Sequence, residues 1–237
     1  MADGYLPTTY YVSDGGELRL VDGAVIDEAT VTLQVNGQEL SAFMCSPVDL
    51  EELALGFLRN EKLIQGLDDI ATLALSSTGR SVDVQLHHAI APTRRPIRTS
   101  GCCGGVTFDD LRQVRRPLPG SLRMTGQAVI DRYFDMRAAE RLSPIARGVL
   151  TSGRCTAEQL LLIAEDVGRH NTIDKLWGHA MRRGIDPSGK LIVTTGRVSS
   201  EMVGKAAKMG AQIVASRTSP TSRALVLARA WNITVIG

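Results

Sequence analysis

The chain has 237 residues, of which 27 are basic and 25 acidic, so its net charge is only +2. This balance and an aromatic content of 4% exclude the strong positive field and the stacking platforms of nucleic-acid-binding proteins, and we expect no nucleic-acid partner. Four cysteines are too few for a disulfide scaffold and indicate a reducing compartment. No stretch approaches the roughly 18 apolar residues of a membrane helix, and the first residues do not resemble a signal peptide, so we expect a cytoplasmic protein with no membrane partner.

The first hundred residues alternate strand-like runs with turns, which predicts a small sheet. Asn36-Gly37 is a strong hairpin signal between the first two runs. From Asp49 onward, apolar residues recur at three- and four-residue spacing behind an acidic start, which predicts a helix that packs on the sheet. The predicted strands are Ala29 to Val35, Glu39 to Met44, Ala71 to Leu75 and Ser81 to Leu86. These elements predict an N-terminal α+β domain over residues 1–98.

Residues 99–121 form a predicted connector that carries two adjacent cysteines, Cys102 and Cys103. Their neighbours from Thr99 to Val106 are small or flexible, so the two thiols are placed to react. The alternative is a glycine-rich turn in which the cysteines are small fillers. Nearby arginines would stabilise thiolates and attract an anion, unless they are only a solvated surface. These arginines are Arg94, Arg95, Arg98, Arg112, Arg115, Arg116 and Arg123.

The second half of the chain alternates strands and helices. Short apolar runs such as Leu191-Ile-Val193 are typical of buried parallel strands. The predicted strands are Gln159 to Ala164, Lys190 to Thr195, Gln212 to Ser216 and Thr234 to Ile236. The predicted helices are Asn171 to Arg183, Ser199 to Met209 and Thr221 to Ala230. This order predicts a mainly parallel α/β sheet in a C-terminal domain over residues 122–237.

Polar residues gather where three of these strands lead into helices. Open α/β sheets bind ligands at this edge, and free amides at a helix start can hold a phosphate group. The alternative for each single residue is a helix cap or a satisfied ion pair. The three polar strings are Glu165-Asp-Val-Gly-Arg-His-Asn171 with Asp174-Lys175, Thr195-Gly-Arg197 with Ser199, Glu201 and Lys205, and Ser219-Pro-Thr221.

These strings resemble the C-terminal signature of the FdhD family of formate dehydrogenase accessory sulfurtransferases. EDVGRHN with DK, TGR followed by SSEMVGKAA, and TSPT stand in the family's order and spacing. Leu53-Ala-Leu-Gly-Phe-Leu58 with Glu61 is similar to its N-terminal signature. The resemblance implies an α/β fold in which a three-layer, cytidine-deaminase-like domain follows a smaller α+β domain. No protein-ligated metal follows from that likeness, because the chain lacks a His-x-Glu pair with a later Cys-x-x-Cys.

The resemblance also implies a homodimeric sulfur carrier that is required for formate dehydrogenase activity. Such a sulfurtransferase accepts sulfur from a cysteine desulfurase as a persulfide on Cys102 or Cys103. It passes the sulfur to the molybdenum cofactor, bis-molybdopterin guanine dinucleotide, in whose place a guanine nucleotide can bind. The implied cofactor-binding residues are Glu165, Asp166, Arg169, His170, Asn171, Lys175, Gly196, Arg197, Ser199, Glu201, Lys205 and Thr221. The alternatives are a pterin-binding chaperone of the apoenzyme and a thiol redox enzyme, which the missing Cys-x-x-Cys spacing disfavours.

The chain departs from the family pattern at three places. Family members commonly carry two cysteines separated by two residues, and anchoring on Thr99-Ser100 puts Cys102 at the first of these positions, so we expect Cys102 to be the carrier. Cys155 stands where the family has a histidine and would add a third thiol. The sequence ends at Gly237, where the family continues into an arginine-containing tail, so we expect weak cofactor binding.

Overall fold

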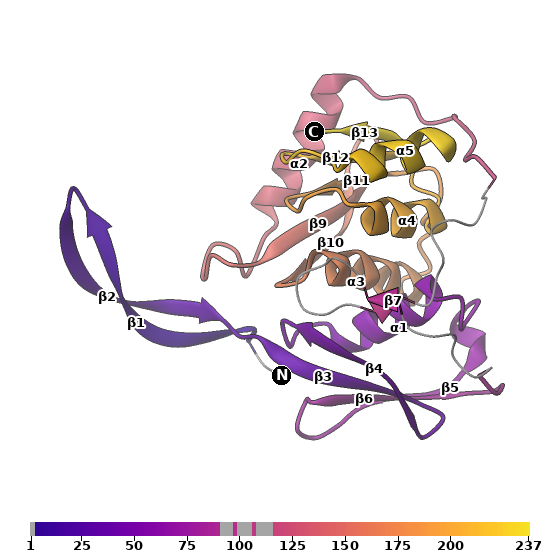
Figure 1. Ribbon diagram of the computed structural model, residues 1–237, viewed down its shortest axis with the longest axis horizontal. Coiled ribbons are helices and arrows are strands. Elements are labelled where there is room, and N and C mark those ends of the chain that lie inside the picture. The colour runs from indigo at the N-terminus through magenta and orange to yellow at the C-terminus, as the bar shows by residue number, and fades with distance from the viewer. Residues whose placement is uncertain (1–2, 91–96, 99–105, 108–115) are drawn as a thin grey trace.

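The computed structural model describes residues 3–90, 97–98, 106–107 and 116–237. Figure 1 shows an N-terminal body, a C-terminal body stacked on it, and a two-stranded arm that projects away from both. Separate sets of buried apolar residues fill the two bodies, one between residues 29 and 86 and the others between residues 129 and 233. The two bodies therefore have their own cores, while the predicted domain boundaries at residues 98 and 121 stay predictions.

The N-terminal body is a four-stranded sheet covered by one helix. Its elements are β3 (Ala29–Val35), β4 (Gln38–Cys45), α1 (Leu50–Asn60), the 3-10 helix η1 (Leu67–Asp69), β5 (Ile70–Leu75) and β6 (Ser81–Leu86), with the strand order β4-β3-β6-β5. Burial alternates along β3, so that Val31, Leu33 and Val35 share a core with α1. Asn36 and Gly37 both have positive φ, as the predicted two-residue hairpin requires. The four predicted strands and the helix are confirmed.

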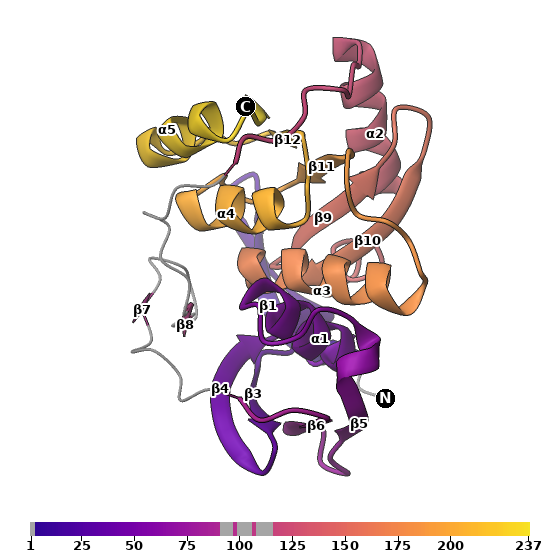
Figure 2. The same cartoon turned by 90° about the vertical axis from the view of Figure 1, so that its right-hand side faces the viewer.

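The C-terminal body is a five-stranded sheet with helices on both faces. Its elements are α2 (Gly126–Ala138), β9 (Leu150–Cys155), β10 (Leu160–Asp166), α3 (Arg169–Arg182), β11 (Leu191–Thr194), α4 (Ser200–Lys208), β12 (Ile213–Ser216), α5 (Ser222–Ala230) and β13 (Thr234–Ile236). Helices α3, α4 and α5 share a core on one face, and α2 packs on the other (Figure 2). This is a three-layer arrangement, and its likeness to cytidine deaminases stays a prediction. None of the described helices is long and apolar enough to cross a membrane.

The expectation of a mainly parallel sheet is only partly right. The strand order is β10-β9-β11-β12-β13, in which the pairings of β12 with β11 and β13 are parallel but β9 pairs antiparallel with both of its neighbours. The sequence predicted no strand at β9, because Thr151-Ser-Gly-Arg154 lacks an apolar run. These residues are buried nonetheless, and the hydroxyls of the first two find partners elsewhere in the chain: Thr151 Oγ1 donates to Glu140 Oε1 at 2.6 Å and Ser152 Oγ to Thr194 Oγ1 at 2.9 Å.

Two ribbons, the arm and a shorter one, and the helix α2 were not predicted. The arm consists of β1 (Tyr5–Asp14) and β2 (Glu17–Ile26), which pair antiparallel over their full length. Among the described residues, neither strand pairs with any other. The second ribbon pairs β7 (Ile97–Arg98) with β8 (Val106–Thr107) on either side of the segment that contains the adjacent cysteines.

The two bodies meet through a close contact between α1 and α3. A Cβ atom at Gly56 would collide with the backbone of Asp174, and one at Gly178 would collide with the backbone of Glu52. Only glycine at both positions lets the helix backbones approach this closely. Gly56 belongs to the Leu53 to Leu58 string, so that string has a structural role in joining the bodies.

Candidate functional site

Three loops meet at the carboxyl ends of β10, β11 and β12, where each strand leads into a helix. Thr194 Oγ1 accepts a hydrogen bond from Gly196 N at 3.1 Å, and Ser216 Oγ donates to Gly196 O at 2.9 Å. The backbone N–H of Thr221 donates to Val198 O at 3.0 Å. These bonds tie the second loop to the third. The three loops together are called the rim below, and they comprise residues 167–170, 195–199 and 217–221.

The helices that leave the rim begin with backbone amides directed toward it. Ser199 and Thr221 cap α4 and α5, because their hydroxyls accept hydrogen bonds from Met202 N at 3.4 Å and Ala224 N at 3.3 Å. Gly168 caps α3 without a side-chain hydrogen bond. Since a helix N-terminus carries partial positive charge, three such ends at one edge favour an anion.

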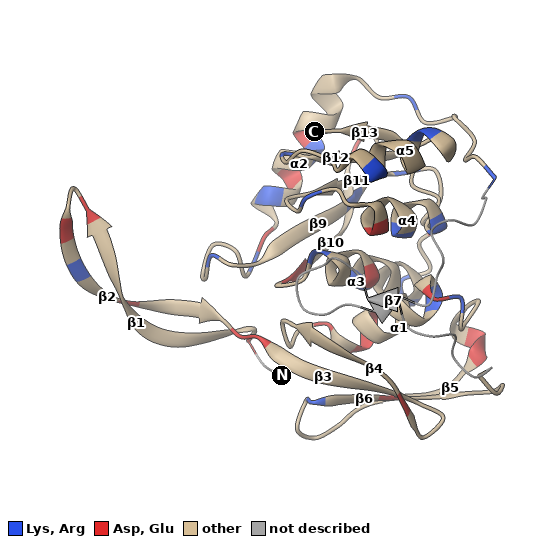
Figure 3. Cartoon of the chain, in the orientation of Figure 1, with Lys and Arg blue, Asp and Glu red and all other residues tan. Residues whose placement is uncertain are grey.

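Exposed arginines add positive charge at the rim. Arg197 and Arg217 are exposed in its loops, and Arg223 is exposed in the first turn of α5. Figure 3 shows basic and acidic residues interspersed over the C-terminal body, so this charge is local. Arg169 is buried instead, and a Cβ atom at Gly196 would lie 3.0 Å from its Cβ. Glycine at position 196 therefore lets the first two loops pack together, and the exposed guanidinium groups suit a phosphate ligand.

His170 forms a buried polar cluster with Ser199 and Glu201. Its Nε2 lies 3.2 Å from Glu201 Oε2 and 3.4 Å from Ser199 Oγ, and Ser199 Oγ donates to Glu201 Oε2 at 3.1 Å. Burial lowers the pKa of His170, although the hydrogen bond to Glu201 opposes this effect. The short His170–Glu201 contact is therefore a hydrogen bond from a neutral imidazole, and not an ion pair, at pH 7. It orients the carboxylate beside the start of α4.

Three predicted site residues lie between the two bodies. Lys175 Nζ is 2.6 Å from Asp166 Oδ2, and both side chains are fully buried. Lys175 Nζ also donates to Ser46 O at 3.2 Å. Asn171 Nδ2 donates to Asp166 Oδ1 at 2.8 Å and to Met44 O at 2.9 Å. These side chains hold the segment before α1 against α3.

Glu165 and Lys205 also have structural partners. The Glu165 carboxylate accepts hydrogen bonds from the backbone N–H groups of residues 141–143 at 2.8 to 3.1 Å, which fixes the loop after α2. Lys205 Nζ donates to Asp174 Oδ2, and Asp174 Oδ1 accepts from Asn60 Nδ2 of α1 at 2.5 Å. The charged groups of Glu165 and Lys205 thus form hydrogen bonds with other residues of the chain.

The structure therefore divides the predicted cofactor-binding residues into two groups. Those at or beside the rim are Arg169, His170, Gly196, Arg197, Ser199, Glu201 and Thr221. Those in structural contacts are Glu165, Asp166, Asn171, Lys175 and Lys205. The sequence does not separate the groups, because decisive partners such as Ser46 and Asn60 lie more than a hundred residues away. Cofactor binding by any of these residues stays a prediction.

The predicted carriers Cys102 and Cys103 lie outside the described residues. Cys45 and Cys155 are both fully buried. Burial raises the pKa of Cys155 to about 12, so this residue is a protonated thiol at neutral pH. The expectation that Cys155 adds a third reactive thiol is therefore wrong, because its place in β9 faces the core under α2.

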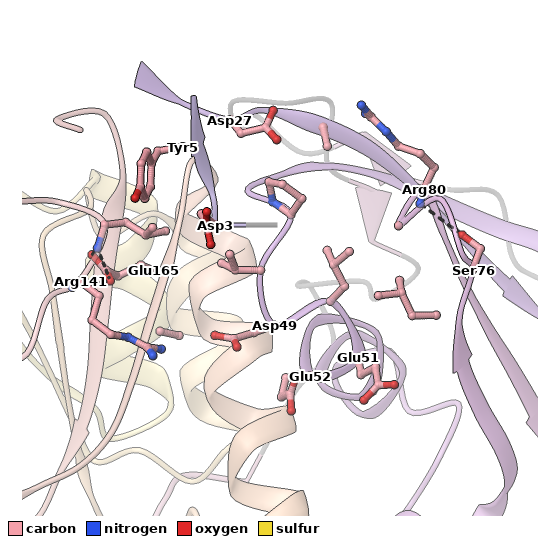
Figure 4. Close-up of a pocket in the computed structure, with 18 of the residues that line it drawn as sticks. Asp3, Tyr5, Asp27, Asp49, Glu51, Glu52, Ser76, Arg80, Arg141 and Glu165 are labelled. Atoms are coloured by element: carbon pink, nitrogen blue, oxygen red, sulfur yellow. Dashed lines mark hydrogen bonds between the residues drawn. The ribbon is translucent and has the colours of Figure 1, made fainter. Parts of the chain in front are cut away.

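A cleft of about 1200 Å³ lies between the bodies at the base of the arm. Figure 4 shows Asp3, Asp27 and Asp49 around it, with Arg141 reaching toward Asp49. A hydrogen bond from His179 holds the pKa of Asp49 below its usual value. The acidic residues that line the cleft are Asp3, Asp27, Asp49, Glu51, Glu52 and Glu165. The sequence did not predict this cleft, because its lining comes from distant segments. Its excess of carboxylates suits an anion less well than the rim does.

Fold and site together define an α/β protein of two bodies. Its rim, at the carboxyl ends of strands β10, β11 and β12, combines helix N-termini with exposed arginines and suits an anion. Among the described residues, no cluster of His, Cys, Asp and Glu side chains has the geometry of a metal site. The chain belongs to the FdhD/NarQ family, whose sequence model matches residues 26–237. The resemblance seen in the polar strings is thereby confirmed.

Relatives of this chain match it over nearly its full length. The sulfur carrier protein FdhD of Bacillus subtilis (strain 168) is 34% identical over 230 residues, which are 94% of this chain and 87% of that protein. The protein of the same name from Shouchella clausii is 32% identical over 231 residues, 94% of this chain and 86% of that protein. The crystal structure of a formate dehydrogenase accessory protein from Desulfotalea psychrophila has a TM-score of 0.78 and 26% identity, and covers 98% of this chain and 91% of its own.

Proposed function

We propose that this protein is a sulfur carrier that supports the activity of a formate dehydrogenase. The observation that carries the proposal is the likeness over 94% of the chain to proteins named sulfur carriers. The sequence adds two adjacent thiols, Cys102 and Cys103, in a glycine-rich run flanked by arginines. The proposal includes a cysteine desulfurase as donor, a homodimeric assembly and a location in the cytoplasm, where thiols stay reduced.

In the proposed reaction, the thiolate of Cys102 attacks the terminal sulfur of a persulfide on the desulfurase. A new S–S bond forms, the bond to the donor cysteine breaks, and the donor leaves as a thiolate. Cys102 then carries the sulfur to the substrate, the molybdenum cofactor bis-molybdopterin guanine dinucleotide. Sulfur delivered as sulfide takes up two electrons, which a thiol reductant supplies as it becomes a disulfide. The flanking arginines favour the thiolate that begins this sequence.

We propose further that the rim binds the dinucleotide part of this substrate. Its phosphate groups are anionic, and the rim offers the capped starts of α4 and α5 together with exposed Arg197 and Arg217. A guanine nucleotide such as GDP carries the same phosphate chemistry and serves as a probe. The neutral His170 and its partner Glu201 would position the first turn of α4 for this contact.

The test is the intact mass of the reduced protein after incubation with a cysteine desulfurase and cysteine. We expect a gain of about 32 Da, one sulfur atom, in the wild type. The gain should be lost in Cys102→Ser and kept in Cys103→Ser. Cys155→Ala is the matched control, because that thiol is buried and protonated. A gain that disappears only in Cys155→Ala would refute Cys102 as the carrier.

A second measurement separates a carrier from a chaperone that only binds the pterin or the apoenzyme. The variant Cys102→Ser/Cys103→Ser should not restore formate dehydrogenase activity in cells that lack the native protein. Full restoration of activity by this variant would favour the binding chaperone over the sulfur carrier. The same conclusion would follow if neither the wild type nor any variant gained mass with an active desulfurase.

A further inference from the structure

Three buried hydroxyl groups form a row beside the first two loops of the rim. They belong to Ser152 of β9, Thr172 in the first turn of α3 and Thr194 at the end of β11, and all three residues are fully buried. Ser152 Oγ lies between the other two oxygen atoms, 2.7 Å from Thr172 Oγ1 and 2.9 Å from Thr194 Oγ1. Polar groups without access to water need partners within the protein, and these three supply one another. They are called the hydroxyl row below.

The two ends of the hydroxyl row bind different loops of the rim. Thr172 Oγ1 donates a hydrogen bond to Arg169 O in the first loop at 2.7 Å. Thr194 Oγ1 accepts one from Gly196 N in the second loop at 3.1 Å. Ser152 lies in the middle of the row. A continuous chain of hydrogen bonds therefore runs from the first loop to the second through strand β9.

The hydroxyl row holds fewer protons than its hydrogen bonds require. Each serine or threonine hydroxyl donates one hydrogen bond, so the row donates three. Among the described residues, four hydrogen-bond distances would each use one of these protons: two within the row, one to Arg169 O, and one from Thr194 Oγ1 to Thr151 O at 3.2 Å. Thr172 therefore donates either to Arg169 O or to Ser152 Oγ. The hydrogen bond that holds the first loop thus depends on the direction in which Ser152 donates.

The first two loops are packed closely enough for a shift in one to reach the other. A Cβ atom at Gly196 would lie 3.0 Å from Arg169 Cβ and 3.5 Å from Thr194 Oγ1. Strand β9 also holds the second loop directly, because Thr195 N donates to Thr151 O at 2.9 Å. Close-packed groups transmit strain to their neighbours. The hydroxyl row therefore lies where it can set the separation of the two loops.

We propose that Ser152 is a positioning residue of the rim, whose hydroxyl couples the first loop, through Thr172, to the second loop, through Thr194. Ser152 is fully buried and does not itself contact a ligand at the rim. The inference rests on the proposed function, in which the rim binds the phosphate groups of a dinucleotide. A ligand that contacts both loops binds more tightly when their separation is already fixed, because less ordering accompanies binding. Ser152 thus affects the affinity of a site that it does not touch.

The first test measures GDP binding by calorimetry in variants that lose one hydroxyl of the row. We expect Ser152→Ala and Thr172→Val to weaken binding about tenfold, the effect of one lost hydrogen bond. Thr172→Ser keeps the hydroxyl and should bind GDP as the wild type does. Ser81→Ala is the matched control, because Ser81 Oγ is buried in β6 of the N-terminal body and has no hydrogen-bond partner among the described residues. It should leave the affinity unchanged.

A double-mutant cycle tests whether Ser152 couples the two loops. Thr172→Val and Thr194→Val should each weaken GDP binding about tenfold, and the double variant should lose far less than the roughly hundredfold that independent effects would give. In a Ser152→Ala background the two effects should become independent and multiply. Independent effects in the presence of Ser152 would contradict the coupling.

Hydrogen exchange at the backbone N–H of Gly196 reports on positioning without a ligand. Ser152→Ala and Thr172→Val should speed this exchange about tenfold or more, although neither side chain bonds to that N–H group. Thr172→Ser should exchange at the rate of the wild type. Because the effect of Thr172→Val must pass through Ser152, it distinguishes a coupled row from separate hydrogen bonds.

The two readouts separate failure of this inference from failure of the proposed function. If the wild type does not bind GDP, the proposed nucleotide site is wrong, and exchange at Gly196 alone then decides whether Ser152 positions the second loop. A purely structural row would lower the melting temperature of Ser152→Ala without changing GDP affinity or exchange at Gly196, and this result would overturn the inference. A tenfold loss of affinity in Ser81→Ala, or loss of binding in Thr172→Ser, would overturn it as well.

Discussion

The ammonium group of Lys175 lies 2.6 Å from a carboxylate oxygen of Asp166, and neither side chain has any exposed surface. Both groups also hold Ser46 of the N-terminal body. Lys175 Nζ donates to its carbonyl oxygen at 3.2 Å, and Asp166 Oδ2 accepts from its N–H at 3.2 Å. The buried pair therefore joins the two bodies, and two residues of the EDVGRHN and DK strings serve the fold.

Lys175→Met leaves the Asp166 carboxylate buried without its cation. We expect the free energy of unfolding to fall by about 3–5 kcal/mol in urea denaturation, because an uncompensated buried charge is that costly. Arg19→Met is the control, since Arg19 and Asp14 form an exposed pair at 2.9 Å whose loss should cost less than about 1 kcal/mol. Similar small losses in both variants would contradict the joining role of Lys175.

Gly56→Ala places a methyl group against the backbone of Asp174. The helices α1 and α3 must then move apart, and we expect a loss of about 3 kcal/mol or more in unfolding free energy, at the upper end of overpacking effects. Gly66→Ala is the matched control, because a Cβ atom there meets nothing within 4 Å. Thermal unfolding should separate the two variants clearly. Equal stability would mean that the helix contact is looser than the structure shows.

The sequence predicts those elements that local sequence patterns specify, such as turn residues, alternating apolar residues and helix caps. The Asn36-Gly37 hairpin, the alternation in β3 and the start of α4 at Ser199 are local features, and the structure has them at the predicted places. Strand β9 was not predicted because it lacks an apolar run, and the hydroxyls of its buried Thr151 and Ser152 find their partners in other segments of the chain. The arm was not predicted because both of its faces are largely exposed, so its strands lack an alternation of buried apolar and exposed polar residues.

In the candidate site, too, local sequence patterns predict some features, and partners distant in the sequence determine the others. The sequence predicts that the three polar strings meet at one edge, because each of them follows a strand and leads into a helix. Which residues of a string face the rim depends on partners such as Ser46 and Asn60, more than a hundred residues away. Neighbouring residues such as Asp166 and His170 therefore differ in role although their sequence context is the same.

The buried imidazole of His170 should make stability depend on pH. Burial lowers its pKa in the folded protein, so between the unfolded value of about 6.5 and the lower folded value the unfolded chain binds more protons. The contribution of His170 to the free energy of unfolding is fully present above about pH 6.5 and is lost as the pH falls. We expect the stability advantage of the wild type over His170→Gln to shrink between pH 7.5 and pH 5. A stability curve of His170→Gln that runs parallel to that of the wild type over this pH range would contradict the assignment.

Arg197 tests the proposed role of the rim with GDP as the probe. Loss of one charge-assisted contact to a phosphate should weaken binding about tenfold in calorimetry for Arg197→Ala. Arg80→Ala is the matched control, because Arg80 lines the acidic cleft and not the rim. The remaining affinity of Arg197→Ala should also depend less steeply on salt. Weakening by Arg80→Ala alone would move the nucleotide site to the cleft.

Cys155 should be inert toward alkylation in the folded protein. Burial raises the pKa of its thiol to about 12 from an ordinary value of 9.0, so the thiolate fraction at pH 8 is about a thousandfold smaller than that of an exposed cysteine. Iodoacetamide followed by mass mapping should leave Cys155 and the buried Cys45 unlabelled in native protein and label both in urea. Cys155→Ala should remove one label in urea and none in the native state. Rapid native labelling of Cys155 would show that β9 opens to solvent and would return this residue to the candidates for the sulfur carrier.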